Sequence, residues 1–516
     1  MGGRPLFILS EGSRRTTGRD AQSSNITAGK AVAQAVRTTL GPRGMDKMLV
    51  SSDGDVVITN DGATILEEMD IEHPAAQMIV EVAETQEEEV GDGTTTAAIL
   101  AGQLLTEAEE LLQQDVHATT IVEGYYEAAT IAKETIDAHV IDVEVDEALL
   151  KQVAMSSMTG KGTGGLTADR LAKTVVDAVL SVDDDDQDAI TIETRVGAST
   201  AATELVEGVI LDEKPVHDNM PWVAEDATIA VVDASLNVRK GELDVEYAVE
   251  TVEELTAAMD SEAEELKGYA QVFADADVDV VVATEKIDKR VREHLAKADI
   301  IAFDDVSDKD ARRIARATGA RRIGSVTDFD EEDLGSVERV QVRLFGEDEL
   351  AFFEGGEAAE SVTIFVRGGT EHVVQELERV IEDSIDVVQT TRDSGLVVPG
   401  AGSSEIAISS AIREAAAGIT GRRQLAVEAF ADAVDTIART IAENSGEDPI
   451  DALVELRALH DETGRAGLIV EGAQVVYDDP VEYGIFDPAA VKHEAIDSAT
   501  EAATMIIRID DVIAAS

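Results

Sequence analysis

Three short glycine-rich segments near the start of the chain carry the side chains best suited to chemistry: residues 39–44 (TLGPRG), 60–64 (NDGAT) and 91–96 (GDGTTT). In the third, two glycines flank Asp92 and three threonines open an expected helix. The first turn of a helix presents unpaired N–H groups and a partial positive charge, which suit a phosphate. A carboxylate beside that phosphate suits Mg²⁺. Taken alone, however, the segment favours the alternative of an ordinary helix capped by Asp or Thr.

Several other chemistries are excluded or weakly supported. No Walker A sequence is present, and no cysteine is available as a nucleophile or zinc ligand. The histidines lack the H-E-x-x-H spacing of zinc hydrolases. A dinucleotide-type glycine run at 160–165 follows residues 147–158, which look helical, whereas that motif needs a preceding strand. A flexible loop carrying Lys161 is the better interpretation. Asp61 in a turn and Asp383 on a helix are candidate catalytic carboxylates, and each is individually weak.

The composition limits the class of protein. The chain has 516 residues, enough for about three domains, and a net charge of −64 from 106 acidic and 42 basic residues. Such an acidic excess argues against a nucleic-acid partner, because that binding depends on Lys and Arg. Arg outnumbers Lys, and the acids are spread along the chain, which is typical of a protein adapted to high salt. No apolar run reaches the length of a signal-peptide core or a membrane span. We therefore expect a cytoplasmic protein without a membrane partner.

The elements that position these residues follow a pattern that changes along the chain. Apolar spacing predicts helices over 25–40, 74–88, 94–112 and 371–389, and a short β run over 55–59. The middle, 212–364, alternates β runs at 228–232, 278–282 and 300–303 with helices over 251–273, 285–297 and 307–318, which indicates an α/β domain. The acidic run at 183–186 is expected in a solvated loop. Residues 403–516 are again helical and end in a strand-like run at 506–510. The two ends of the chain thus share a helical pattern that the middle lacks. This indicates that the middle is a domain inserted between two parts of another domain.

Five blocks of the sequence resemble archaeal group II chaperonins in the same order and with similar gaps: 38–49, 60–66, 72–96, 365–388 and 498–513. The resemblance implies a multidomain α+β chaperonin fold. A mainly helical equatorial ATP-binding domain would comprise 1–143 and 399–516, and a small intermediate domain would comprise 144–211 and 365–398. An α/β apical substrate-binding domain would comprise 212–364, with a helical lid protrusion near 240–273. From pattern alone, the helix at 251–273 is equally a core-packed helix.

The resemblance also implies a function. Similar proteins are ATP-dependent chaperones that enclose non-native client proteins. They form two stacked rings of eight or nine subunits each, and the subunits are identical or paralogous. ATP and Mg²⁺ would be the cofactors, with K⁺ as a further candidate. The β run at 55–59 and the runs at 6–9 and 506–509 would pair between neighbouring subunits. The alternative is a chaperonin-like scaffold that assembles but no longer hydrolyses ATP.

The resemblance assigns the nucleotide-binding residues of the family to individual positions in this sequence. Asp61 and Asp383 would flank the γ-phosphate as catalytic residues, and Asp92 would hold Mg²⁺. The remaining nucleotide-binding residues would be Thr39, Leu40, Gly41, Pro42, Gly93, Thr94, Thr95, Thr96, Thr159, Gly160, Lys161, Gly400, Gly402 and Asp487. One position departs from the family, because Ala401 replaces the middle of three consecutive glycines. Ala401 would be strained if that position needs a positive φ.

Overall fold

The structure, a computed structural model, describes residues 14–52, 54–182, 189–237, 252–326, 329–356 and 361–514. The chain divides into two compact units. The helical unit consists of Met1–Val176 and Gln375–Ser516, and the inserted unit consists of Asp177–Val374. The acidic run at 183–186 and the run at 6–9 lie outside the described residues.

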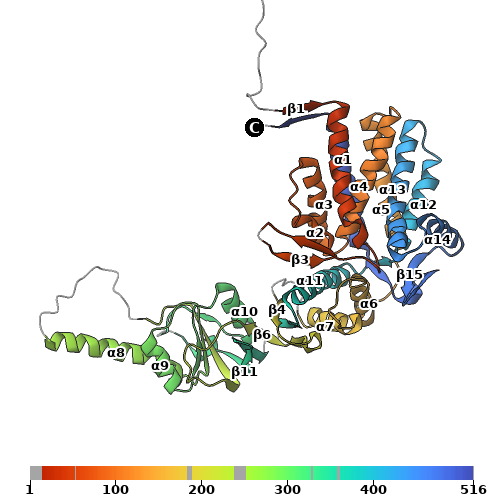
Figure 1. Cartoon of the computed structure of the whole chain (residues 1–516). Helices are drawn as coiled ribbons and strands as arrows, with labels where there is room; N and C mark the ends of the chain where they lie inside the picture. Colours follow the sequence, from red (N-terminus) through yellow and green to blue (C-terminus); the bar gives the residue numbers. More distant parts are fainter. Residues whose placement is uncertain are drawn as a thin grey trace, which may run out of the picture. The chain divides into compact units, whose positions relative to one another are not determined.

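Long helices lie side by side in the helical unit (Figure 1). The α-helices that lie wholly within the described part of this unit, long and short, are α1 (Arg19–Val36), α2 (Gly62–Glu67), α3 (Pro74–Val90), α4 (Thr94–Gln113), α5 (Ala118–His139), α6 (Glu147–Ser157), α12 (Ser403–Ala416), α13 (Arg422–Ser445), α14 (Pro449–Thr463) and α15 (Ala489–Ile507). Helices α7 (Ala168–Leu180) and α11 (Glu371–Ser394) each cross a boundary between the two units. The predicted helices over 25–40, 74–88, 94–112 and 371–389 are confirmed, with small shifts at their ends.

Small residues let these helices approach closely. A Cβ atom on Gly29 of α1 would lie 2.6 Å from Leu105 of α4, and one on Gly102 would lie 2.2 Å from the Cβ of Ala33. The core that results is built mostly from Ala, Val, Ile and Leu, with Tyr125 and Phe430 as an edge-to-face aromatic pair. An interior of this kind keeps crystal-like density without large side chains.

Four short two-stranded sheets complete the described part of the helical unit. They pair β1 (Arg14–Thr17) with β18 (Asp511–Ala514), β2 (Lys47–Val50) with β3 (Val56–Thr59), β14 (Val397–Pro399) with β17 (Phe486–Pro488), and β15 (Gly467–Glu471) with β16 (Gln474–Asp478). The β run at 55–59 is confirmed as β3. The strand predicted at 506–510 is wrong, because Ile506 and Ile507 are the fully buried end of α15 and the strand begins at Asp511.

A mixed seven-stranded sheet forms the centre of the described inserted unit. Its strands are β6 (Gly208–Leu211), β7 (Val223–Val232), β8 (Val280–Ala283), β9 (Ile301–Phe303), β10 (Arg322–Ile323), β11 (Gly335–Phe345) and β12 (Asp348–Gly356). Helices α9 (Lys289–Lys297) and α10 (Asp308–Thr318) connect strands of this sheet, while β4 (Ile190–Val196), β13 (Val362–Gly368) and β5 (Glu204–Val206) form a separate small sheet. Strands β8 and β9 are buried throughout, as parallel strands covered on both faces should be. The predicted α/β character of the middle of the chain is confirmed.

Helix α8 (Val252–Asp275) has two different halves. In its C-terminal half, Leu266, Tyr269 and Phe273 pack into the core against the sheet, while Met259 in the other half is exposed. Figure 1 shows the N-terminal half extending beyond the sheet and α9. The core-packed interpretation therefore holds for the C-terminal half, and the lid protrusion stays a prediction. The rest of the proposed protrusion, 238–251, lies outside the described residues.

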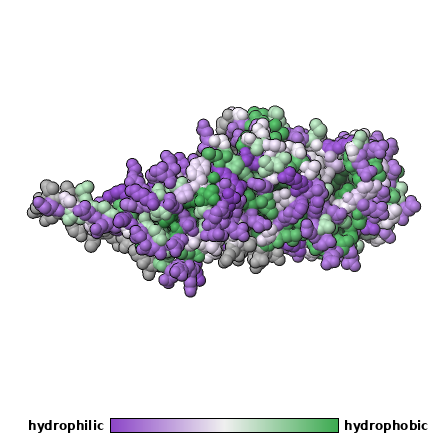
Figure 2. Space-filling view, turned by 90° about the horizontal axis from the view of Figure 1, so that it is seen from below, coloured by the Kyte–Doolittle hydropathy of each residue, from purple (hydrophilic) through white to green (hydrophobic). Residues whose placement is uncertain are grey.

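The surface agrees with the acidic composition. Hydrophilic side chains predominate on the face seen in Figure 2, between smaller hydrophobic patches. Among the described residues, no helix combines the length and apolar character needed to span a bilayer.

Candidate functional site

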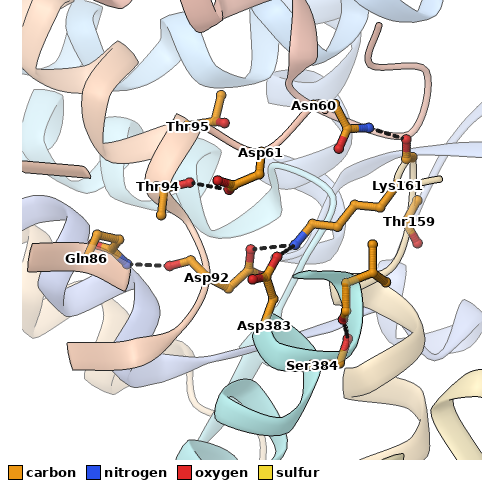
Figure 3. A network of polar contacts seen from close by, with 12 residues as sticks. Asn60, Asp61, Gln86, Asp92, Thr94, Thr95, Thr159, Lys161, Asp383 and Ser384 are labelled. Carbon is orange, nitrogen blue, oxygen red and sulfur yellow. Dashed lines mark hydrogen bonds and ion pairs between the residues drawn. The ribbon is translucent and has the colours of Figure 1, made fainter. Parts of the chain in front are cut away.

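Two helices of the helical unit begin beside each other and bring the second and third glycine-rich segments together. Asp61 Oδ2 accepts a hydrogen bond from the backbone N–H of Thr64 at 2.7 Å, which caps α2, and Asp61 Oδ1 accepts one from the Thr94 hydroxyl at 3.2 Å (Figure 3). A Cβ atom on Gly62 would lie 2.6 Å from Thr95 Oγ1, so this contact requires glycine.

The first turn of α4 is open to a ligand. Gly93 occupies the capping position, and among the described residues no side chain caps this helix. The alternative of an ordinary helix capped by Asp or Thr is therefore wrong for α4. Its N–H groups and the hydroxyls of Thr95 and Thr96 remain for an anionic group, whereas the Thr94 hydroxyl already donates to Asp61.

Residues 91–93 form a rigid link that carries Asp92. Gly91 and Gly93 have φ values of 67° and 83°, in the region that favours glycine. The fully buried Gln86 donates through Nε2 to the backbone oxygen of Asp92 at 2.7 Å and to that of Val491 at 3.1 Å. These contacts fix the backbone, so that the Asp92 carboxylate lies 3.9 Å from Lys161 Nζ.

The loop after α6 brings Lys161 into the same place. Gly160 has φ 84°, a Cβ atom there would lie 2.5 Å from the Gly41 oxygen, and Asn60 Nδ2 donates to the Gly160 oxygen at 2.7 Å. Lys161 Nζ donates to Asp383 Oδ2 at 2.5 Å (Figure 3). The element before this loop is the helix α6, which confirms that the glycine run is not a dinucleotide motif.

Burial and the charge of Lys161 shift the pKa values of these carboxylates in opposite directions. Burial raises the pKa of Asp383 to about 7, although the adjacent Lys161 ammonium opposes the shift. Burial likewise raises the pKa of Asp92 against the effect of Lys161. Burial lowers the pKa of Lys161, but the charges of Asp383 and Asp92 outweigh it and leave the pKa well above its usual value. The charge of Asp61 also acts on Lys161, so three carboxylates share one ammonium and the site favours an added cation.

A cavity of about 310 Å³ joins the glycine-rich segments. Of the predicted residues, its lining contains Thr39, Leu40, Gly41, Pro42, Asp61, Asp92, Gly93, Thr94, Thr95, Thr96, Thr159, Gly160, Lys161, Gly402 and Asp487. Two predicted residues are not in the lining. Asp383 contacts Lys161, which is a lining residue. Gly400 contacts the lining residue Asp487, whose Oδ1 would be 3.0 Å from a Cβ atom on that glycine. Sequence segments from both ends of the chain thus meet at one cavity.

Ala401, the departure from the glycine run, has φ 55°. It therefore occupies the left-handed region that costs an L-residue free energy, as the sequence led us to expect. Its backbone oxygen accepts a hydrogen bond from Leu468 N at 3.0 Å, which holds this conformation.

Ala401→Gly is expected to raise the free energy of unfolding by about 0.5–1 kcal/mol, because glycine relieves the strain at the cost of some unfolded-state entropy. Ala417→Gly is the matched control, since Ala417 has a right-handed φ of −60° and glycine there should destabilise. Guanidinium unfolding midpoints measure both variants. A loss of stability in Ala401→Gly equal to that of the control would contradict the assigned strain.

Sequence reasoning missed Glu87, on α3 beside the catalytic candidates. Its Oε2 is buried and accepts no hydrogen bond from the described residues, and its carboxyl shares a side-chain hydrogen bond with Asp383. Burial and the negative charges of Asp383 and Asp61 raise the pKa of Glu87 to about 10. The carboxyl therefore holds a proton at neutral pH. Nothing in the local acidic run at 87–89 distinguishes this residue from its neighbours.

Glu87→Gln is expected to make the protein less sensitive to alkaline pH. Because its pKa is raised on folding, wild-type Glu87 lowers stability progressively as pH rises from about 4.5 towards about 10. The variant should therefore gain about 1–3 kcal/mol relative to wild type between pH 5.5 and pH 8.5. Unfolding midpoints at the two pH values measure the gain. Glu88→Gln, at an exposed neighbour, should leave the wild-type pH slope unchanged, and the same slope in Glu87→Gln would refute the protonated state.

Lys492 and Glu405 also line the cavity and were not predicted. Each lies in the first turn of a helix, α15 and α12 respectively, and they form an ion pair at 2.8 Å. They are 87 positions apart in the sequence, so no local pattern indicates the pairing. A lysine in an otherwise apolar and small-residue stretch, in a chain poor in lysine, is the signal that could have drawn attention to it.

The donor set fits a magnesium ion bound together with phosphates. Among the described residues, no group of three or more acidic or histidine side chains is arranged to hold a metal by itself. Mg²⁺ usually takes one or two carboxylates and completes its shell with water and substrate phosphates. Asp92, at the open start of α4, supplies one such carboxylate.

Comparisons with known proteins agree with this site. Residues 32–516 match the TCP-1/cpn60 chaperonin family. Thermosome subunit 3 of Haloferax volcanii is 64% identical over 517 residues, covering 99% of each chain. Thermosome subunit alpha of Halobacterium salinarum is 52% identical over 520 residues, covering 100% of this chain and 92% of that protein. The chain therefore belongs to the TCP-1/cpn60 chaperonin family and, within it, to the group II chaperonins.

This membership confirms the resemblance carried by the five sequence blocks. The protein has the multidomain α+β chaperonin fold, and it is a subunit of an ATP-hydrolysing molecular chaperone that folds proteins. Relatives in Haloferax and Halobacterium agree with the salt-adapted composition.

Proposed function

We propose that the cavity of the helical unit is where this chaperonin subunit binds and hydrolyses ATP. The observation that carries the proposal is the convergence of three glycine-rich segments, the Lys161 loop and Asp487 on one cavity. A cavity of about 310 Å³, lined by both polar and apolar side chains, suits a nucleotide.

The phosphates would lie at the start of α4. Its open N–H groups, the hydroxyls of Thr95 and Thr96, and the Lys161 ammonium would donate to phosphate oxygens, while the Thr94 hydroxyl holds Asp61. Mg²⁺ held by Asp92 would neutralise phosphate charge, and K⁺ is a further candidate cation. The adenosine would lie between Leu40, Gly41, Pro42 and the apolar wall formed by Ile437, Ile441 and Leu468, with its ribose near Asp487.

The two remaining carboxylates, Asp61 and Asp383, would have different roles toward the attacking water. Both oxygens of Asp61 already accept hydrogen bonds, from Thr64 and Thr94, so Asp61 would position the water. Asp383, whose pKa lies near neutrality, would accept the proton, while Lys161 holds one of its oxygens. Phosphoryl transfer depends mainly on such positioning and charge stabilisation.

We assign three domains to the subunit: equatorial (1–143 and 399–516), intermediate (144–211 and 365–398) and apical (212–364). Identical or paralogous subunits would form a cytoplasmic double ring that encloses non-native proteins, without nucleic-acid or membrane partners. The exposed N-terminal half of α8 supports a built-in lid near 240–273.

Electron microscopy of the purified chain in molar KCl tests the assembly. We expect double rings that are open without nucleotide and capped with Mg-ATP, and only monomers or small oligomers would argue against self-assembly. Phosphate release under the same conditions tests the site, because a non-hydrolysing scaffold would form rings without turnover.

A further inference from the structure

Glu87 and Asp383 form a buried pair of carboxyl groups where the end of α3 meets α11. The Asp383 side chain is 6% exposed, and Glu87 Oε2 is buried and accepts no hydrogen bond from the described residues. The two carboxyl groups share a side-chain hydrogen bond. Gly91 ends α3 so close to α11 that a Cβ atom there would lie 2.1 Å from the Cβ of Asp386. The packing of the two helices therefore fixes the pair.

The hydrogen bond between the two carboxyl groups requires a proton, because an ionised carboxylate only accepts hydrogen bonds. Burial and the charges of Asp383 and Asp61 raise the pKa of Glu87 to about 10. Burial raises the pKa of Asp383 only to about 7, because the Lys161 ammonium opposes the shift. The proton therefore belongs to Glu87, and Asp383 is the acceptor.

Asp383 faces one cation and two further carboxylates besides Glu87. Lys161 Nζ donates to its Oδ2 at 2.5 Å, while the charges of Asp61 and Asp92 act against its ionised form. In the proposed complex Lys161 also donates to phosphate oxygens, so its donors are divided between Asp383 and the nucleotide. Glu87 is not among the residues that line the cavity. Its contact with Asp383 therefore does not depend on the ligand.

We propose that Glu87 is a positioning residue for the general base. By donating a hydrogen bond to Asp383, it orients that carboxylate and favours its ionised form near neutral pH, so that Asp383 can accept the proton of the attacking water. Glu87 itself transfers no proton in the reaction. The inference rests on the proposed function, in which Asp383 is the base, and adds the neighbour that prepares it.

The test compares the pH dependence of single-turnover ATP hydrolysis, in molar KCl with Mg²⁺, in wild type, Glu87→Met and Glu87→Gln. Methionine is a flexible side chain without a hydrogen-bond donor, whereas the glutamine amide can still donate to Asp383. Glu87→Met should move the midpoint of the rise in rate upward by about one pH unit, which lowers the rate at pH 6 about tenfold. Glu87→Gln should reverse most of this shift.

Glu88→Met, at the exposed neighbouring position, is the matched control and should keep the wild-type profile. A purely structural defect in Glu87→Met would lower the rate equally at every pH, and an unmoved midpoint overturns the inference. If Glu87→Met does not fold, the infrared difference between wild type and Glu87→Gln at pH 8 replaces it. A carboxylic-acid band in wild type supports the donated proton, and its absence overturns it. A wild-type rate that does not rise through neutrality would instead refute Asp383 as the base.

Discussion

Asp383→Asn is expected to lower the rate of ATP hydrolysis by about 10²- to 10⁴-fold, the usual effect of losing a general base. The amide has the shape of the carboxylate and still accepts a hydrogen bond from Lys161, so the fold should survive. It does not accept the proton of the attacking water. Phosphate release in molar KCl with Mg²⁺ measures the rate, and ADP binding should stay close to that of wild type.

The pH profile separates a catalytic role from a structural one. Because the pKa of Asp383 is about 7 and its ionised form is the base, the wild-type rate should rise with pH through neutrality. The residual rate of the Asn variant should lack this rise. Glu382→Gln, at the exposed neighbouring position of α11, should behave as wild type. An Asn variant within threefold of wild type would show that Asp383 is not the base.

Asp92→Asn is expected to weaken ADP binding about 10- to 100-fold when Mg²⁺ is present, because the carboxylate proposed to hold the metal loses its charge. Calorimetry with Mg²⁺ and with EDTA makes the prediction specific. In EDTA, the affinity of wild type for ADP should fall to that of the variant, and the affinity of the variant should not change. Asp142→Asn, an exposed acid of the same unit, should retain the full effect of Mg²⁺. A variant that still responds to Mg²⁺ as wild type does would place the metal elsewhere.

Much of the fold follows from local sequence signals. Apolar spacing and capping residues mark the helices around the cavity, such as Pro74 at the start of α3 and Gly91 at its end. The central strands of the inserted unit are short, continuous apolar runs, and the structure contains them where the pattern indicates. The positive φ of Ala401 could also be anticipated, because the position carries glycine in similar proteins.

The remaining features depend on contacts between distant residues. The run at 506–509 contains three isoleucines and was interpreted as a strand, but Ile506 and Ile507 are buried by helix packing, which local propensity does not reveal. The cation that joins Glu405 and Asp487 comes from another helix, and the charge environment of Glu87 includes Asp383 from a segment almost 300 positions away in the chain. Tertiary packing, rather than local pattern, determines these parts of the site.

The pairing of β1 with β18 sets the order in which the molecule can form. Arg15 and Asp511, joined by hydrogen bonds of 2.9 Å, are 496 positions apart. During synthesis the inserted unit is complete while β18 and α15 are still absent, so it can fold first. Contacts of such long sequence separation form slowly, because chain entropy is lost before they are made. Since α15 also supplies Lys492, the newly made chain gains a complete nucleotide cavity only after α15 has been synthesised.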